Sequence, residues 1–429
     1  MTNFKPHIIP TIAALAASAA LTPHQAQAQS GGTRSYPSTQ APASTAPLPA
    51  ATGGRAKYEP EGNGVYHGAS LPNTWDASGL RTQLQQYQQY AGKRLSVVTW
   101  FASTYTNGRM TSWHNEYLGP LTRVRDAGAL SLIKFSVQDS NFGATKKMAG
   151  LKEITLGVYD AYFQEAADAV KQFGGPVFIS INHEMNGTWE PFSEAYDGSQ
   201  GPAPKVTAAD FVSAWKHIVD IFRQRGANNA AFVWSPNVPD VGPVPFTKYY
   251  PGDDYVDWIG ASFYSGNPIE NLDLIYRTYA ARKPIFITEW ATGEDKNKYY
   301  VGFPGEAKWV DSFFKALDTR YPRVKAISWF QWDKRQYGES NYQLQRDPGQ
   351  QQVYSADIKN PRYLDSAGNN GGTASTGIET ARLEVAPREV VLNEVAPVER
   401  PKAVPPPQAP PVARIKLQIV PREQVRTER

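Results

Sequence analysis

The sequence predicts an α/β protein built on a single (β/α)8 TIM barrel, and three observations support this prediction. Eight short apolar runs follow one another between residues 58 and 365, and segments with helical spacing lie between several of them. No Gly-rich phosphate loop follows an early run, as it would in many dinucleotide-binding sheets. A doubly wound open sheet is the alternative, but eight runs favour a closed barrel.

The predicted strands are short and rich in β-branched and aromatic residues, which is typical of buried parallel strands. They cover residues 64–66, 95–101, 130–137, 177–182, 230–234, 256–262, 285–288 and 324–330. The predicted helices carry apolar residues three and four positions apart. They cover residues 159–173, 211–225, 272–281 and 307–317.

The two ends of the chain have a different character from the region 58–365. Residues 1–28 resemble a signal peptide, with Lys5, an apolar run over 8–21 and a small-x-small site at Ala26 and Ala28. An uncleaved anchor is the alternative. If residues 1–28 direct export, we expect a bacterial protein that is secreted or periplasmic.

Residues 29–57 predict a flexible linker, because they are mostly Ser, Thr, Ala, Pro and Gly. Residues 366–429 predict a disordered Pro-rich tail, because they cannot bury enough apolar surface to offset the entropy of ordering. The tail is either passive or a contact for an envelope or secretion component.

Composition excludes several classes of protein. The chain has no Cys, which excludes thiol nucleophiles and disulfide scaffolds, and its net charge of +4 is not gathered into a basic block of the kind that binds nucleic acid. Residues 187 and 188 are Gly and Thr, so no zinc-binding His-Glu-x-x-His motif forms, and the adjacent Asp253 and Asp254 are weak evidence for calcium. We therefore expect no metal, cofactor or membrane span, and a monomer.

Two glutamates come directly after apolar strands, where a barrel places its function. Glu184 follows the fourth predicted strand, Glu289 follows the seventh, and each has a Trp nearby in Trp189 and Trp290. A buried carboxylate is costly unless it is paired or used. A salt bridge or a helix cap is the structural alternative. Hydrolysis of a glycosidic bond requires two such carboxyl groups, and strands four and seven face each other across a barrel.

The stretches 183–189 (HEMNGTW) and 250–260 (YPGDDYVDWIG) resemble glycoside hydrolase family 26. The segments 234–237 (WSPN) and 287–289 (ITE) fit the same family. The resemblance implies a barrel clan with its acid/base on strand four and its nucleophile on strand seven. Glu184 would then be the acid/base and Glu289 the nucleophile of a retaining reaction.

The same resemblance implies roles for other residues. Tyr264 matches a tyrosine that hydrogen-bonds the nucleophile, and His183 matches the residue beside the acid/base. The remaining substrate-binding candidates are Trp189, Trp290 and Trp332 as stacking platforms, Asn237 near the site, and Trp100 and His114 at distal subsites, with Tyr105 and Trp113 as weaker ones. Packing at the rim of the barrel is the alternative for each aromatic residue.

The sequence thus predicts a secreted, endo-acting retaining hydrolase of a β-linked polysaccharide. β-Mannan, β-1,3/1,4-glucan and xylan all remain open, with mannan favoured by family frequency. Many mannan-cutting relatives carry an Arg-Pro-containing approach to the His-Glu pair, whereas residues 180–182 here are Ser-Ile-Asn. The alternative is a catalytically silent protein on the same barrel, for polysaccharide binding or exopolysaccharide export.

Overall fold

A computed structural model describes residues 54–294 and 300–368. Eight parallel strands form its centre: β1 (Val65–Ser70), β2 (Val97–Thr106), β4 (Leu130–Asp139), β5 (Val177–Ile181), β6 (Ala230–Trp234), β7 (Trp258–Tyr264), β8 (Ile285–Ala291) and β9 (Val324–Phe330). Each strand pairs with the next along the chain, and β1 pairs with both β2 and β9, which closes the sheet. The predicted (β/α)8 barrel is therefore confirmed. The signal peptide and most of the linker and tail lie outside the described residues.

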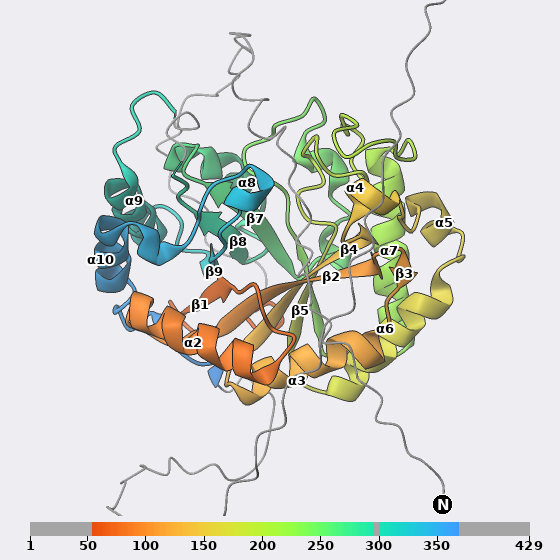
Figure 1. The fold of residues 1–429 in the computed structure, drawn as a ribbon, viewed down its shortest axis with the longest axis horizontal. Coiled ribbons are helices and arrows are strands. Elements are labelled where there is room, and N and C mark those ends of the chain that lie inside the picture. Colours follow the sequence, from red (N-terminus) through yellow and green to blue (C-terminus); the bar gives the residue numbers. More distant parts are fainter. Residues whose placement is uncertain (1–53, 295–299, 369–429) are drawn as a thin grey trace, which may run out of the picture. The chain divides into compact units, whose positions relative to one another are not determined.

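Helices lie between the strands and outside them, as Figure 1 shows. They are α2 (Ala77–Ala91), α3 (Leu118–Asp126), α6 (Asp160–Phe173), α7 (Ala208–Gln224), α8 (Asp273–Tyr279), α9 (Glu306–Thr319) and α10 (Pro348–Asp357). The connection from β6 to β7 contains two 3-10 turns instead, Phe246–Tyr249 and Asp253–Tyr255. Its prolines explain this difference, because proline interrupts helical hydrogen bonding.

Several short elements decorate this framework. At the carboxyl end of β2 lie the antiparallel strand β3 (Arg109–Met110) and a π-helix (Trp113–Tyr117), and β10 (Tyr363–Leu364) pairs with β1. The others are α4 (Phe142–Thr145), α5 (Leu151–Thr155) and the 3-10 turns Ile269–Leu272, Arg335–Tyr337 and Leu344–Arg346. Within the described residues, no helix is long and apolar enough to cross a membrane.

The inside of the barrel changes from apolar to polar along its axis. An apolar cluster that includes Leu132, Phe178 and Phe286 fills the amino-terminal part. The rings of Phe178 (β5) and Phe286 (β8) meet at 5.8 Å although these strands are not neighbours, so both rings point inward. Because alternate residues of a strand share a face, Lys134 points inward with Leu132, but closer to the carboxyl end. The polar end of the barrel is therefore where a reactive site can form.

We predict that Gly260→Ala lowers the free energy of unfolding by about 1–3 kcal/mol. Gly260 lies in β7, and a Cβ atom there would come within 2.5 Å of the Ser235 Cβ. Denaturant unfolding measures the change. Gly143→Ala is the matched control, because nothing lies within 4 Å of its added Cβ. Equal stability of the two variants would contradict the close approach of β6 and β7.

Candidate active site

Glu289 is fixed by two donors at the carboxyl end of β8. The Lys134 ammonium, which is fully buried, lies 2.7 Å from Glu289 Oε1, and the Tyr264 hydroxyl donates to Oε2 at 2.6 Å. Burial and the nearby Glu289 charge raise the pKa of Tyr264 well above its usual value, so its hydroxyl stays protonated and donates. Both oxygens of the Glu289 carboxylate are therefore held by a donor.

A register shift in β8 decides which way Glu289 points. Ala261 of β7 pairs with Ile287, but the next residue, Ser262, pairs with Glu289, so Thr288 is an extra residue in β8. Simple alternation from the inward-facing Phe286 would have turned Glu289 outward. The bulge reverses this and places Glu289 inside the barrel, as bulges beside active sites commonly do.

Glu184 lies just after β5 and is 2% exposed. Burial, followed by the charge of Glu289, raises the pKa of Glu184 to about 7. The Trp189 indole N–H donates to Glu184 Oε2 at 3.0 Å and opposes this increase, as do Lys134 and the Ser262 hydroxyl. Near neutral pH the Glu184 carboxyl group can therefore still hold a proton beside Glu289, which is paired with Lys134.

The backbone around Glu184 adopts the left-handed region at two residues. Asn182 has φ 49° and Glu184 has φ 57°. The Asn182 side chain accepts a hydrogen bond from the Val137 amide at 2.9 Å, and the Glu184 amide donates to the Ser235 carbonyl at 2.8 Å. These bonds from β4 and β6 hold the turn that aims the Glu184 carboxyl group at the barrel axis.

His183 is a buried, neutral imidazole. Burial, Lys134 and Lys334 together lower its pKa well below the usual value, in that order of importance. Within the described residues its Nδ1 has no hydrogen-bond partner, and its ring lies 5.7 Å from that of Phe101. His183 therefore lies beside the carboxyl groups with a free nitrogen, and its role in binding substrate stays a prediction.

Three other predicted binding residues border the same region. Trp332 stacks on Phe330 with a ring separation of 6.0 Å and donates to the Ser70 hydroxyl. Trp189 contacts Glu184 directly, as described above. Asn237 pairs with Ser262 in an isolated bridge, and Asn186 holds it by hydrogen bonds to its amide and carbonyl groups. Asn186 thus organises the rim.

Trp290 is not a sugar platform but a core residue. It is fully buried, and its ring stacks on Phe313 of α9 at 3.9 Å. The bulge that turns Glu289 inward turns Trp290 outward into the helix layer. Trp113 is similarly buried and donates to the Tyr162 hydroxyl.

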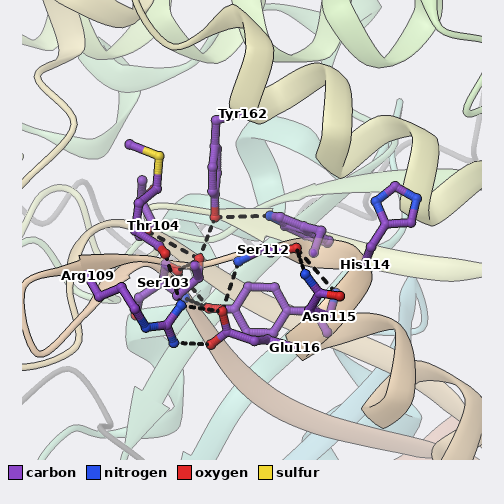
Figure 2. Close-up of polar contacts among 12 residues, drawn as sticks. Ser103, Thr104, Arg109, Ser112, His114, Asn115, Glu116 and Tyr162 are labelled. Atoms are coloured by element: carbon purple, nitrogen blue, oxygen red, sulfur yellow. Dashed lines mark hydrogen bonds and ion pairs between the residues drawn. The ribbon is translucent and has the colours of Figure 1, made fainter.

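His114 differs from the expectation that it faces substrate. His114 points toward Glu165 of α6, with 3.4 Å between Nδ1 and Oε1, and away from the Arg109–Glu116 pair (Figure 2). Trp100 is 1% exposed, donates to the Ser131 hydroxyl and is among the residues that line a neighbouring cavity, and its role at a distal subsite stays a prediction. Tyr105 is half-buried beside Tyr159.

A cavity of about 660 Å³ extends from Trp332 toward α3. Trp75, Phe101 and Tyr117 form aromatic parts of its wall, and Arg109 and Glu116 form part of its rim. Arg109 makes two parallel hydrogen bonds of 2.9 Å to the Glu116 carboxylate, drawn in Figure 2. This fork-to-fork pair fixes the β3 hairpin against the π-helix, so the rim is preorganised.

Sequence reasoning missed two buried groups that complete the site. Lys134 interrupts the apolar run 130–137 at an inward position, and this was the available signal. Glu190 follows Trp189 and is fully buried, but its sequence context resembles a surface loop. Among the described residues, no group of three or more His, Cys, Asp or Glu side chains could hold a metal ion.

The family model of "Glycosyl hydrolase family 26" matches residues 107–339, which are more than half of the chain and include both glutamates. The chain belongs to glycosyl hydrolase family 26. The resemblance of its motifs to this family is therefore confirmed, and family membership places the barrel among the O-glycosyl hydrolases.

Known relatives of this family 26 barrel include two curated bacterial proteins. Endoglucanase H of Acetivibrio thermocellus is 27% identical over 278 residues, which are 62% of this chain and 27% of that protein. Mannan endo-1,4-beta-mannosidase A and B of Caldalkalibacillus mannanilyticus is 28% identical over 169 residues, or 38% of this chain and 30% of that protein. The chain thus spans between a quarter and a third of their lengths.

A solved structure shares the fold of this family 26 chain. It is a beta-mannanase from a symbiotic protist of the termite Reticulitermes speratus, complexed with gluco-manno-oligosaccharide. Its TM-score is 0.51 at 14% sequence identity, over 76% of this chain and 99% of that one.

We predict that Lys134→Met lowers the free energy of unfolding by about 3–5 kcal/mol, because it leaves the buried Glu289 carboxylate without its cation. Denaturant unfolding is the measurement. Lys134→Met combined with Glu289→Leu should recover much of the loss, because no charge is then stranded. Lys315→Met is the control: it removes an exposed pair with Asp311 and should leave the unfolding midpoint nearly unchanged. Equal losses in the free energy of unfolding for Lys134→Met and Lys315→Met would contradict the assignment of Lys134 and Glu289 as a buried ion pair.

Proposed function

We propose that the protein is an exported, endo-acting hydrolase that cleaves a β-linked polysaccharide with retention of configuration. Glu289 is the nucleophile and Glu184 is the acid/base. The observation that carries the proposal is the contrast between the two carboxyl groups. Glu289 is charge-paired and doubly hydrogen-bonded, whereas burial and the Glu289 charge raise the pKa of Glu184 to about 7.

In the first step the Glu289 carboxylate attacks the anomeric carbon, and the bond from that carbon to the glycosidic oxygen breaks. Glu184 gives its proton to the departing oxygen, which leaves a glycosyl ester on Glu289. In the second step Glu184, now ionised, takes a proton from water. The water oxygen attacks the anomeric carbon and releases Glu289, so two inversions give net retention.

Retention is supported by how closely the two carboxyl groups are linked. Ser262 is close enough to Glu184 to lower the pKa of that carboxyl, and its hydroxyl lies 3.3 Å from the Lys134 ammonium that pairs with Glu289. A single serine and a single lysine thus connect the acid and the nucleophile. Inverting enzymes instead separate their carboxyl groups widely enough to admit a water molecule.

Polysaccharide binding is supported by the cavity whose wall includes Phe101, because the Phe101 ring lies 5.7 Å from that of His183, the neighbour of Glu184. It starts at Trp332 and continues past the aromatic wall that Trp75 contributes. A space of about 660 Å³ beyond the reacting bond can hold further sugar units, which suits an enzyme that cuts inside a chain. The names of the two bacterial relatives favour β-glucan and β-mannan as the first substrates to test, with xylan as a third.

We propose export on the basis of residues 1–28 alone, which have a charged start, an apolar run and a small-x-small site. Residues 366–429, which are mostly outside the described part, are proposed as a tail that either is passive or contacts an envelope component. Mass determination of the mature amino terminus tests the first proposal: a chain that begins beyond residue 28 would support it.

We predict that the purified protein releases oligosaccharides from β-mannan, mixed-linkage β-glucan, xylan or bacterial exopolysaccharide, and that Glu289→Ala loses about 10³-fold or more in kcat/KM. The loss is expected because the covalent step has no nucleophile. Product sizing separates endo from exo action, and NMR of the first anomer released tests retention. A Glu289→Ala variant as active as the wild type would disprove the assignment, and binding without cleavage in both proteins would favour the silent binding protein.

We predict that kcat/KM falls above a pH of about 7, as Glu184 loses the proton that it must donate. Trp189→Phe should move this alkaline limb to higher pH. The Trp189 N–H stabilises the ionised Glu184, so its removal raises the pKa of that carboxyl. Rate profiles over pH measure the shift, with Trp75→Phe as the control. An alkaline limb that moves to lower pH in Trp189→Phe, or that moves equally in both variants, would contradict the role of the Trp189 indole as a donor to Glu184.

A further inference from the structure

Glu190 is a carboxyl group in the catalytic region that the proposed reaction does not use. It lies directly after Trp189, whose indole contacts Glu184, and it is 0% exposed. Its backbone is fixed on both sides. The Ser193 amide donates to its carbonyl at 2.9 Å, and the Gln200 side chain donates to the Trp189 carbonyl at the same distance.

The Glu190 carboxyl has neither an ion pair nor a good hydrogen bond. Within residues 54–294 and 300–368, neither of its oxygens has a hydrogen-bond partner. Gln138 of β4 is the polar side chain close enough to affect it, and the Gln138 Oε1 also lacks a partner among the described residues. The Gln138 Oε1 and both carboxyl oxygens of Glu190 thus lie buried and close together without a partner among the described residues.

The surroundings of Glu190 favour its uncharged form, and this explains how a carboxyl group can be buried there. Burial first, and then the Glu184 carboxyl, raise the pKa of Glu190 to about 8, while Gln138 and Lys334 oppose the increase. Glu289 adds a smaller increase. Glu190 is therefore mostly a neutral carboxylic acid at neutral pH, with one O–H donor and one carbonyl acceptor.

A purely structural role explains this arrangement poorly. A buried polar group without partners costs free energy, and an apolar side chain of similar volume would fill the same space without that cost. A ligand hydroxyl would instead use the free atoms. Neighbouring hydroxyl groups of a sugar both donate and accept, as the carboxylic acid and the amide do.

We propose that Glu190, together with Gln138, binds hydroxyl groups of the sugar unit on the departing side of the cleaved bond. The proposal rests on the proposed function. Glu184 must reach the glycosidic oxygen, which belongs to the departing unit after cleavage, and Glu190 follows Glu184 in the same loop. Glu190 is thus a specificity-determining residue for the leaving sugar, distinct from the two residues that perform the chemistry.

The test compares substrates with and without a sugar as the leaving group. The first set contains β-1,4-linked gluco- and manno-oligosaccharides, and the second contains the 2,4-dinitrophenyl glycosides of the corresponding disaccharides. Glu190→Leu and Gln138→Leu should each lower kcat/KM for the oligosaccharides by about 10-fold or more, the loss expected for one or two hydrogen bonds. Both variants should stay within about 3-fold of the wild type on the dinitrophenyl glycosides.

Glu190→Gln provides conservative rescue, because an amide keeps one donor and one acceptor. It should retain most of the oligosaccharide activity that Glu190→Leu loses. Oligosaccharides that lack single hydroxyls on the departing unit supply a second readout. For one of these deoxygenated oligosaccharides, kcat/KM of the wild type should fall to the value of Glu190→Leu. The kcat/KM of Glu190→Leu itself should not fall further on that substrate.

Two results would overturn the proposal: equal losses on both substrate sets, or no loss on the oligosaccharides. A large fall in the melting temperature of Glu190→Leu together with equal losses would assign Glu190 to the fold instead. These outcomes are separate from failure of the proposed function, in which the wild type cleaves neither set. Glu184→Gln is the reference for loss of acid catalysis, because it removes the proton donor but keeps the Glu289 nucleophile.

Discussion

The buried ion pair between Lys134 and Glu289 is the constraint on which the site depends. A lysine at the axis of a barrel needs a carboxylate, and a carboxylate there needs a cation, so neither side chain is stable alone. The pair fixes one negative charge at the carboxyl end of the barrel. That charge in turn favours the protonated form of Glu184, its neighbour. One structural contact therefore distinguishes the two carboxyl groups chemically.

The strands could be predicted well from the sequence, because buried parallel strands are continuous apolar runs. Besides the short α4 and α5, three helices of nine or more residues escaped prediction because their apolar residues do not form a strong stripe. Helix α2 buries only Leu80, Tyr87 and Ala91 in fifteen residues, and α10 buries Gln350 and Tyr354. Helix α3 is short and contains Gly and Pro. In each case tertiary packing, and not a strong apolar stripe, selects the helix.

The candidate site was predictable where it depends only on which residues end a strand, because the carboxyl ends of all barrel strands lie at the same end of the barrel. The sequence placed Glu184, Glu289 and Tyr264 at strand ends, and the structure brings them together. It could not indicate the extra residue Thr288 in β8, so Trp290 was expected beside the substrate although it faces the helices. Lys134 was missed because its partner Glu289 is distant in sequence, and pairing across a barrel leaves no local pattern. Glu190 was missed because its sequence context resembles a surface loop.

The left-handed backbone at Glu184 has an evolutionary consequence. Glycine or asparagine would adopt φ 57° at a lower cost than glutamate, by roughly 1 kcal/mol. Replacement would also remove a carboxyl group from a nearly dry interior. The backbone conformation and the burial of Glu184 both cost free energy, so holding the acid here is a trade-off between stability and activity. Descendants of this barrel that are no longer selected for hydrolysis would therefore be free to replace Glu184 with a residue that adopts this backbone conformation at lower cost.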